Sequence, residues 1–156
     1  MTHPAMTDVT IHTYTPNLRP SSGQFEQISA FLFKALESYG DPLEDIRKAM
    51  TYALNLQDVP GRGGLVLTAQ DEDSRILGAV VINETGMSGY IPEYILVYIA
   101  VDPDTRGMGL GKRLMETALH TVQGGIALHV EPDNPARRLY EKLGFTNKYL
   151  EMRFQP

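Results

Sequence analysis

A glycine-rich segment flanked by basic residues carries the clearest chemical signal in this chain. Residues 101–112 read VDPDTRGMGLGK, with three glycines alternating along the last part of the segment. Glycine lacks a Cβ, so backbone N–H groups can approach a ligand closely. A helix N-terminus adds unpaired N–H groups and a partial positive charge. With Arg106 and Lys112 beside these groups, the segment predicts a pyrophosphate site.

Two better-known phosphate loops do not fit this segment. A P-loop needs a glycine where Arg106 stands and a Ser or Thr where Arg113 follows Lys112. A dinucleotide-binding fingerprint needs a third glycine where Leu114 stands. A purely structural alternative remains, in which the glycines only permit a tight turn from strand to helix.

The segment joins a strand expected over 93–101 to a helix expected over 109–123. Upstream, alternating and helical spacings predict a strand over 9–14, two helices over 21–40 and 41–57, and a hairpin of strands over 65–70 and 75–83. Downstream we expect a strand over 126–130, a helix over 134–143 and a closing strand over 148–154. This order predicts one mixed α/β sheet with helices on both faces.

Local signals mark the starts of the first two helices. Ser21 with Gln24 three residues later predicts a capping box. Asp41, followed by proline and then by an acid in the first turn, predicts an N-cap for the second helix.

Composition narrows the functional class. The length of 156 residues suits one domain over 1–156, and the net charge of −5 argues against a nucleic-acid partner. No cysteine is available for a disulfide or a nucleophile. The start has no secretory pattern, and the longest apolar run is too short to cross a membrane. We expect a cytoplasmic protein without a membrane partner.

Two motifs together resemble those of the GNAT superfamily of acyl-CoA-dependent N-acetyltransferases. The pattern Arg106-x-x-Gly109-x-Gly111 after a Val-x-Pro strand end resembles the family's pyrophosphate motif. The run NPARRLYEKLGF over 134–145 resembles its second motif, in the family's order and separation. The resemblance extends to the upstream element order and to the closing segment. It implies the acyl-CoA N-acyltransferase fold, with a mixed, mostly antiparallel sheet flanked by helices, as a single N-acetyltransferase domain.

The resemblance also implies acetyl-CoA (coenzyme A) as the cofactor. Its pyrophosphate would be held by Arg106, Gly107, Met108, Gly109, Leu110, Gly111 and Lys112. Main-chain groups of Ile99, Ala100 and Val101 would contact the pantetheine and the thioester carbonyl, with residues 126–130 as the other lip. Asn134 stands one residue nearer to Tyr140 than in many members, so it either contacts the cofactor or only caps its helix.

The implied reaction is direct attack of a primary amine on the thioester in a ternary complex. Tyr140 would protonate the leaving thiolate; the alternative is a packed core tyrosine. Glu93 is the candidate base, against the alternative of a solvated acid at a strand edge, and Glu84, Glu131 and His129 are weaker candidates. The histidines show no metal-binding spacing.

Two alternatives to an enzyme are a non-catalytic acyl-CoA-binding or sensing domain of the same fold, and an interaction domain that leaves the glycine loop unexplained. The acceptor is expected to be a small-molecule or peptide amine. The acidic balance favours cationic amines, although no motif identifies the acceptor, and a homodimer is left open.

Overall fold

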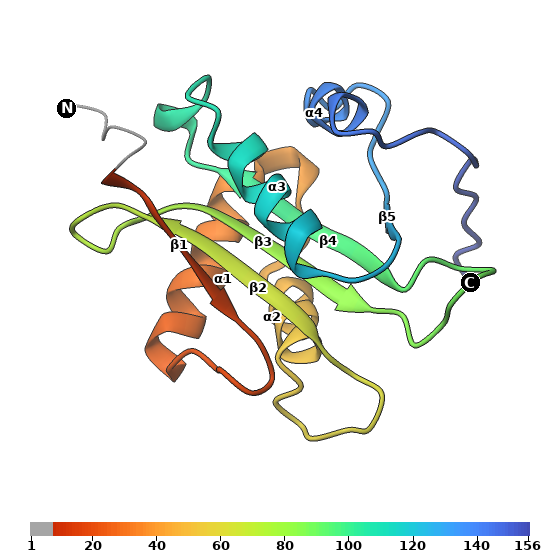
Figure 1. Cartoon of the computed structure of the whole chain (residues 1–156), viewed down its shortest axis with the longest axis horizontal. Helices are drawn as coiled ribbons and strands as arrows, with labels where there is room; N and C mark the ends of the chain where they lie inside the picture. Colours follow the sequence, from red (N-terminus) through yellow and green to blue (C-terminus); the bar gives the residue numbers. More distant parts are fainter. Residues whose placement is uncertain (1–7) are drawn as a thin grey trace.

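Five strands form one sheet in which spatial order follows chain order (Figure 1). The computed structural model describes residues 8–156. The strands are β1 (Thr10–Tyr14), β2 (Gly64–Gln70), β3 (Ile76–Glu84), β4 (Tyr94–Val101) and β5 (Ile126–Leu128). The first four pair antiparallel in sequence, and β5 runs parallel to β4.

Helices cover both faces of this sheet, as the element order predicted. They are α1 (Ser22–Leu36), α2 (Leu43–Ala53), α3 (Leu110–Thr121) and α4 (Ala136–Lys142), with short 3₁₀ turns η2 (Glu37–Tyr39) and η3 (Pro103–Thr105). Side chains of α1 and α2 share one core with one face of the sheet. Those of α3 and α4 share a second core with the other face. Within residues 8–156, no helix combines the length and apolar character that crossing a bilayer requires.

A β-bulge in β4 changes which core its side chains enter. Val81 pairs with Tyr98 and Ile82 pairs with Leu96, so Val97 has no partner in β3. Leu96 therefore faces the core under α3, whereas Tyr98, two residues later, faces the core under α1 and α2. An extra residue in one strand moves the side chains of the residues after it to the opposite faces of the sheet.

The start of α1 confirms its sequence signal, whereas the start of α2 does not. Ser21 and Gln24 form the expected capping box. The N-cap of α2 is Pro42 and not Asp41. The Asp41 carboxylate instead accepts a hydrogen bond from the Tyr98 hydroxyl, a tertiary contact that the local pattern could not reveal.

The closing strand expected over 148–154 is wrong. No strand follows α4 in the described chain, and Tyr149, Leu150, Met152 and Phe154 are 79–90% exposed. An alternating pattern gives a strand only where another strand supplies the hydrogen bonds, and this segment pairs with none. Within the described chain its side-chain contacts are local, such as the ion pair between Glu151 and Arg153.

The helix α3 lies close against the centre of the sheet. Leu114 of α3 is fully buried, and a Cβ placed on Gly78 of β3 would lie 2.7 Å from its Cδ1 atom. The glycine therefore permits the close approach that fixes the start of α3.

We expect Leu114→Ala to lower the free energy of unfolding by about 2–5 kcal/mol, because it leaves a cavity between helix and sheet. Chemical denaturation measures this loss. Glu116→Ala on the exposed side of α3 is the control and should cost no more than about 0.5 kcal/mol. If both variants lost the same free energy of unfolding, the packing of Leu114 against Gly78 would not be what holds α3 on the sheet.

Candidate functional site

The loop before α3 has the backbone that its glycines predict. Gly107 and Gly109 adopt φ values of 86° and 78°, in the left-handed region that favours glycine. A Cβ on either residue would meet nothing within 4 Å, so this side of the loop is open. Gly111 differs, because a Cβ there would lie 3.4 Å from Leu139 of α4. The third glycine therefore brings α3 and α4 together.

Unpaired backbone donors follow each other through this loop. No described residue accepts a hydrogen bond from the N–H groups of residues 107–112, and the first bond of α3 runs from Arg113 N–H to Gly109 O. Arg106 is exposed and has no ion pair with any described residue, whereas the Lys112 ammonium lies 3.8 Å from Glu116. A row of free N–H groups at a helix start beside a free guanidinium can bind a phosphate or another anion. We call residues 106–112 the anion cradle.

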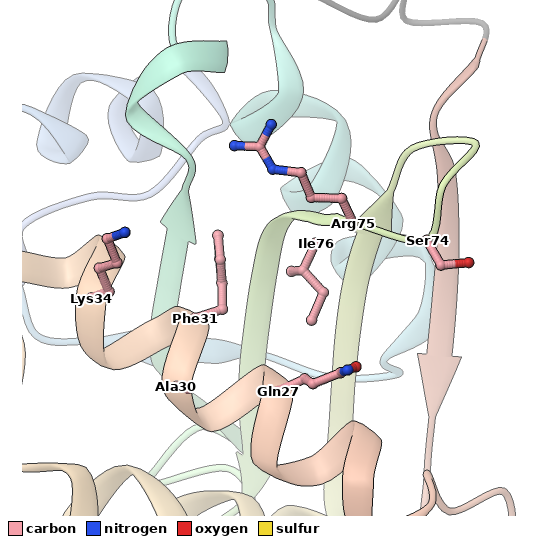
Figure 2. Close-up of a pocket in the computed structure, with 7 residues that line it drawn as sticks. All are labelled: Gln27, Ala30, Phe31, Lys34, Ser74, Arg75 and Ile76. Atoms are coloured by element: carbon pink, nitrogen blue, oxygen red, sulfur yellow. The ribbon is translucent and has the colours of Figure 1, made fainter.

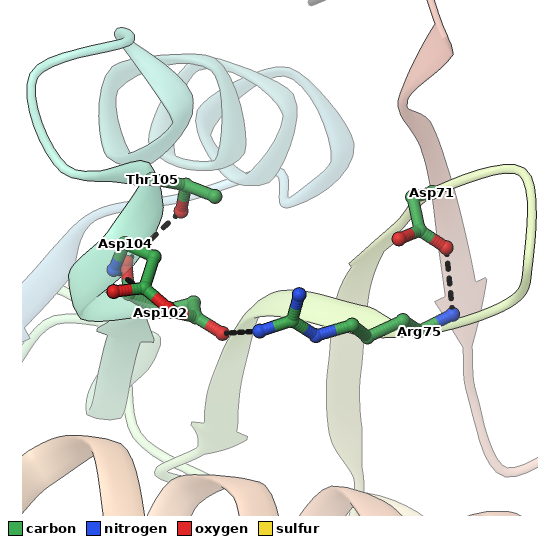
Figure 3. Close-up of polar contacts among 5 residues, drawn as sticks. All are labelled: Asp71, Arg75, Asp102, Asp104 and Thr105. Carbon is green, nitrogen blue, oxygen red and sulfur yellow. Dashed lines mark hydrogen bonds and ion pairs between the residues drawn. The ribbon is translucent and has the colours of Figure 1, made fainter. Parts of the chain in front are cut away.

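Asp102 holds the turn that leads into the cradle (Figure 3). Its carboxylate accepts hydrogen bonds from the Asp104 N–H at 2.9 Å and from the Arg75 guanidinium at 2.7 Å. Its carbonyl oxygen accepts both the N–H and the hydroxyl of Thr105, each at 2.9 Å. The Asp102 side chain is only 13% exposed, so water screens the ion pair less than at an open surface. The sequence reasoning missed this residue, although an Asp–Pro–Asp–Thr run is typical of a side-chain-bonded turn.

The strands β4 and β5 separate soon after they pair. Their register covers only Tyr94–Leu96 and Ile126–Leu128, although β4 continues to Val101. Figure 1 shows the chain leaving β5 toward α4 while β4 runs on toward the cradle. We call residues 97–101 and 129–131 the two sides of the strand parting. The predicted lip over 126–130 is thus paired in its first part and unpaired beyond Leu128.

The parting leaves main-chain groups of β4 without a strand partner. The Asp102 N–H donates to Leu77 O, toward β3. Successive residues of a strand direct their main-chain groups to alternate edges, so the N–H and C=O of Ala100 also point to β3. The N–H and C=O groups of Ile99 and Val101 point to the parting. Of the three β4 residues named from the sequence, these two therefore present their N–H and C=O groups there.

Tyr140 of α4 lies in the core beneath the parting. It is 7% exposed and belongs to the same apolar cluster as Ile99, Val101 and Leu128, with its ring 5.9 Å from that of Phe145. Burial raises the pKa of Tyr140 to about 12. The hydroxyl has no hydrogen-bond partner among residues 8–156. A phenol with this pKa keeps its proton at neutral pH and can donate it.

The Asn134 side chain bonds the turn that leads into α4. Its Oδ1 atom accepts a hydrogen bond from the Ala136 N–H at 2.9 Å. This bond uses only the oxygen of the side-chain amide, and the N-cap of α4 is Pro135 without a side-chain bond, so both alternatives for Asn134 stay predictions.

Glu93 lies before the paired part of β4, and so at the closed end of the parting. Its Oε2 atom accepts a hydrogen bond from the Gly125 N–H at 2.7 Å. Hydrogen bonds from its own backbone N–H and from Gly125 lower the pKa of the Glu93 carboxyl. The structure does not bring this carboxylate to the anion cradle. His129 and Glu131 are exposed on the segment after β5, and Glu84 is exposed at the end of β3.

A hollow of about 420 Å³ lies elsewhere, between α1 and the start of β3 (Figure 2). It is lined by Gln27, Ala30, Phe31, Lys34, Ser74, Arg75 and Ile76. None of the residues that the sequence singled out lines it. Arg75 connects it to the site through the bond to Asp102.

Comparison with known proteins gives a family match and several relatives. The family model described as an acetyltransferase (GNAT) domain matches residues 62–147. A mycothiol acetyltransferase from Kocuria rhizophila is 33% identical over 100 residues, which cover 60% of this chain and 33% of that protein. The N-alpha-acetyltransferase RimI from Mycobacterium tuberculosis is 36% identical over 83 residues, which cover 49% of this chain and 52% of that protein. The chain thus spans about a third of the mycothiol enzyme's length.

A solved structure extends the likeness to the whole fold. The aminoglycoside N-acetyltransferase AAC(6')-Iy in complex with CoA matches with a TM-score of 0.65 at 16% identity, covering 95% of each chain. This match confirms the mixed, mostly antiparallel sheet flanked by helices that was expected from the sequence.

The Glu93 contact makes stability depend on pH. Since the folded-state pKa of Glu93 is lowered, its stabilising effect is present above the ordinary glutamate pKa of about 4.3 and is lost as pH falls through the folded value. We expect Glu93→Gln to lower the melting temperature at pH 7, and the difference from the wild type to shrink below about pH 4. Thermal unfolding of both proteins across this range measures it. If the difference in melting temperature between the two proteins did not vary with pH, the charge of the Glu93 carboxylate would not contribute to stability.

Proposed function

Because this chain belongs to the GNAT acetyltransferase family, we propose that it transfers the acetyl group of acetyl-CoA to a primary amine. The observation that carries the proposal is the anion cradle, whose free N–H groups lie directly after the strand that parts from its neighbour. Acetyl-CoA would supply an acyl thioester, which an amine can attack. The open side of Gly107 and Gly109 fits a bulky pyrophosphate. In this proposal the whole chain serves as one N-acetyltransferase domain.

The cradle would bind the anionic end of the cofactor. Six N–H groups and the Arg106 guanidinium are available without the loss of a hydrogen bond to any described residue. Lys112 would add a second charge, since its contact with Glu116 is long and exposed. Asp102 and Arg75 would keep the loop in place from behind.

The strand parting would align the reacting groups. The unpaired main-chain groups of Ile99 and Val101 could hydrogen-bond an extended amide-containing arm as a neighbouring strand does. An N–H in this row could also stabilise the negative charge that develops on the carbonyl oxygen, an effect of about 3 kcal/mol for one donor. Alignment between the two sides would supply much of the remaining rate.

Tyr140 is proposed as the acid that protonates the leaving sulfur. Its raised pKa keeps the hydroxyl protonated at neutral pH, as a proton donor has to be before it reacts. The acceptor amine must lose a proton, because an amine with a pKa near 10.4 is mostly charged at pH 7. Glu93 stays a prediction for that step, in competition with water, since its lowered pKa weakens it as a base.

The acceptor is proposed to be a primary amine on a small molecule or a peptide. The names of the relatives, a mycothiol acetyltransferase and an N-alpha-acetyltransferase, include both kinds.

A charge placed on the cradle tests the cofactor assignment. In Gly109→Asp the added carboxylate would face the pyrophosphate, so the Kd for CoA should rise at least about tenfold. Gly109→Asn is the control, because asparagine has the same shape, tolerates positive φ and carries no charge. Isothermal titration measures both. Equal affinity for CoA in two folded variants would overturn the pyrophosphate assignment.

Removing one hydroxyl tests the proton donor. Tyr140→Phe keeps the ring in its core, so affinity for acetyl-CoA should hold while kcat falls about 10–10³-fold. Tyr149→Phe, on the exposed terminal segment, should leave both quantities unchanged. A wild-type kcat in Tyr140→Phe would make Tyr140 a packing residue. If the wild-type protein binds acetyl-CoA but acetylates no amine, the alternative of a non-catalytic sensing domain is favoured.

A further inference from the structure

Tyr98 marks the point where β4 and β5 part. The last residue pair between these strands joins Leu96 to Leu128, the next residue of β4 is the bulged Val97, and Tyr98 follows. Its side chain is 7% exposed and points into the core under α1 and α2. Tyr140 lies in the other core, so the two tyrosines border the parting from opposite faces of the sheet.

The Tyr98 hydroxyl fixes a carboxylate on its face of the sheet. It donates to Asp41 Oδ2 at 2.5 Å, the short distance typical of a hydroxyl bonded to a carboxylate. Burial, followed by the bond to Asp41 and the charges of Asp41 and Asp45, raises the pKa of Tyr98. The phenol therefore remains a donor throughout the neutral range.

The second oxygen of Asp41 is available to a ligand. Asp41 is exposed, and its Oδ1 atom has no hydrogen-bond partner among the residues that the structure describes. The segment that carries it also contacts the chain just beyond the second side of the parting, because the Tyr39 hydroxyl donates to Asp133 O at 3.4 Å. The Asp41 carboxylate is thus held beside the parting, with one oxygen anchored and the other open.

The arrangement of the helices determines which substrate meets this carboxylate. The anion cradle begins α3, and α3 and α4 pack on the face opposite to Tyr98. A donor held by the cradle would occupy that side, which leaves the face of α1 and α2 for the acceptor. On that face the exposed Asp41 is the carboxylate that the buried Tyr98 holds in place.

We infer that Asp41, positioned by Tyr98, is a specificity-determining residue that binds a second positive charge on the acceptor. Asp41 lies a full tyrosine side chain away from β4, which is too far for it to hold the attacking nitrogen as well. The acceptor class is therefore an amine with a second cationic group several bonds away, such as a diamine, a polyamine or a peptide with a basic side chain. This inference rests on the proposed acetyltransferase function.

A matched pair of acceptors tests the inference. Cadaverine carries a second ammonium group, and aminopentanol carries a neutral hydroxyl at the same reach. With acetyl-CoA as donor and free thiol as the readout, wild-type kcat/KM should favour cadaverine. Asp41→Asn should lower the ratio of the two kcat/KM values at least about tenfold, the scale of one charged hydrogen bond, with aminopentanol changed by no more than about twofold.

Two further variants separate charge from position. Tyr98→Phe keeps the charge of Asp41 and removes its anchor, so it should raise the KM for cadaverine about two- to tenfold with kcat retained. Glu44→Gln removes a neighbouring exposed charge from α2 and should keep the wild-type ratio.

The outcomes distinguish this inference from the proposed function. The inference is overturned if Asp41→Asn keeps the wild-type ratio of kcat/KM for cadaverine over aminopentanol. It is also overturned if Glu44→Gln lowers this ratio as much as Asp41→Asn does, or if the wild-type ratio is one. Titration of CoA accompanies these assays. If CoA binds but cadaverine is not acetylated, the acceptor class is wrong and the cofactor assignment stands. If CoA does not bind, the proposed function itself fails.

Discussion

The site depends on a shortage of hydrogen-bond partners along one edge of β4. A strand inside a sheet has neighbours on both sides, but β5 accompanies β4 for only three residue pairs. Unpaired main-chain donors and acceptors need water or a ligand, because leaving them buried and unsatisfied is costly. The parting therefore creates a binding edge from the same groups that elsewhere hold the sheet together, and the free N–H row of the cradle continues it into α3.

The bulge at Val97 sets how this edge is presented. It moves Tyr98 into the core of α1 and α2, and it leaves Ile99 and Val101 directed toward the parting. Without the extra residue, the alternation would continue from Leu96, and Tyr98 would face α3. One inserted residue thus separates the proposed donor side, with Tyr140, from the proposed acceptor side, with Tyr98 and Asp41.

Residues whose roles follow from local backbone chemistry could be predicted from the sequence. Gly107 and Gly109 leave one side of the cradle open as expected, Ser21 caps α1, and the order of elements gives the observed sheet. Contacts between distant segments could not be predicted. Asp41 looked like a helix cap because its neighbours in sequence suited one, yet its partner stands on β4. The alternation over 148–154 looked like a strand, but pairing depends on a neighbour that the pattern does not contain.

The two sides of the parting also differ in how firmly they are held. On one side β4 is paired with β3 at every position except the bulged Val97, and α3 is anchored through the fully buried Leu114. On the other side β5 has three paired residues, and α4 has seven residues. Opening of a segment costs less free energy where fewer hydrogen bonds and apolar contacts must be broken. Amide hydrogens of β5 and α4 will therefore exchange with solvent sooner than those of β3, so the side that carries Tyr140 is the more easily opened of the two.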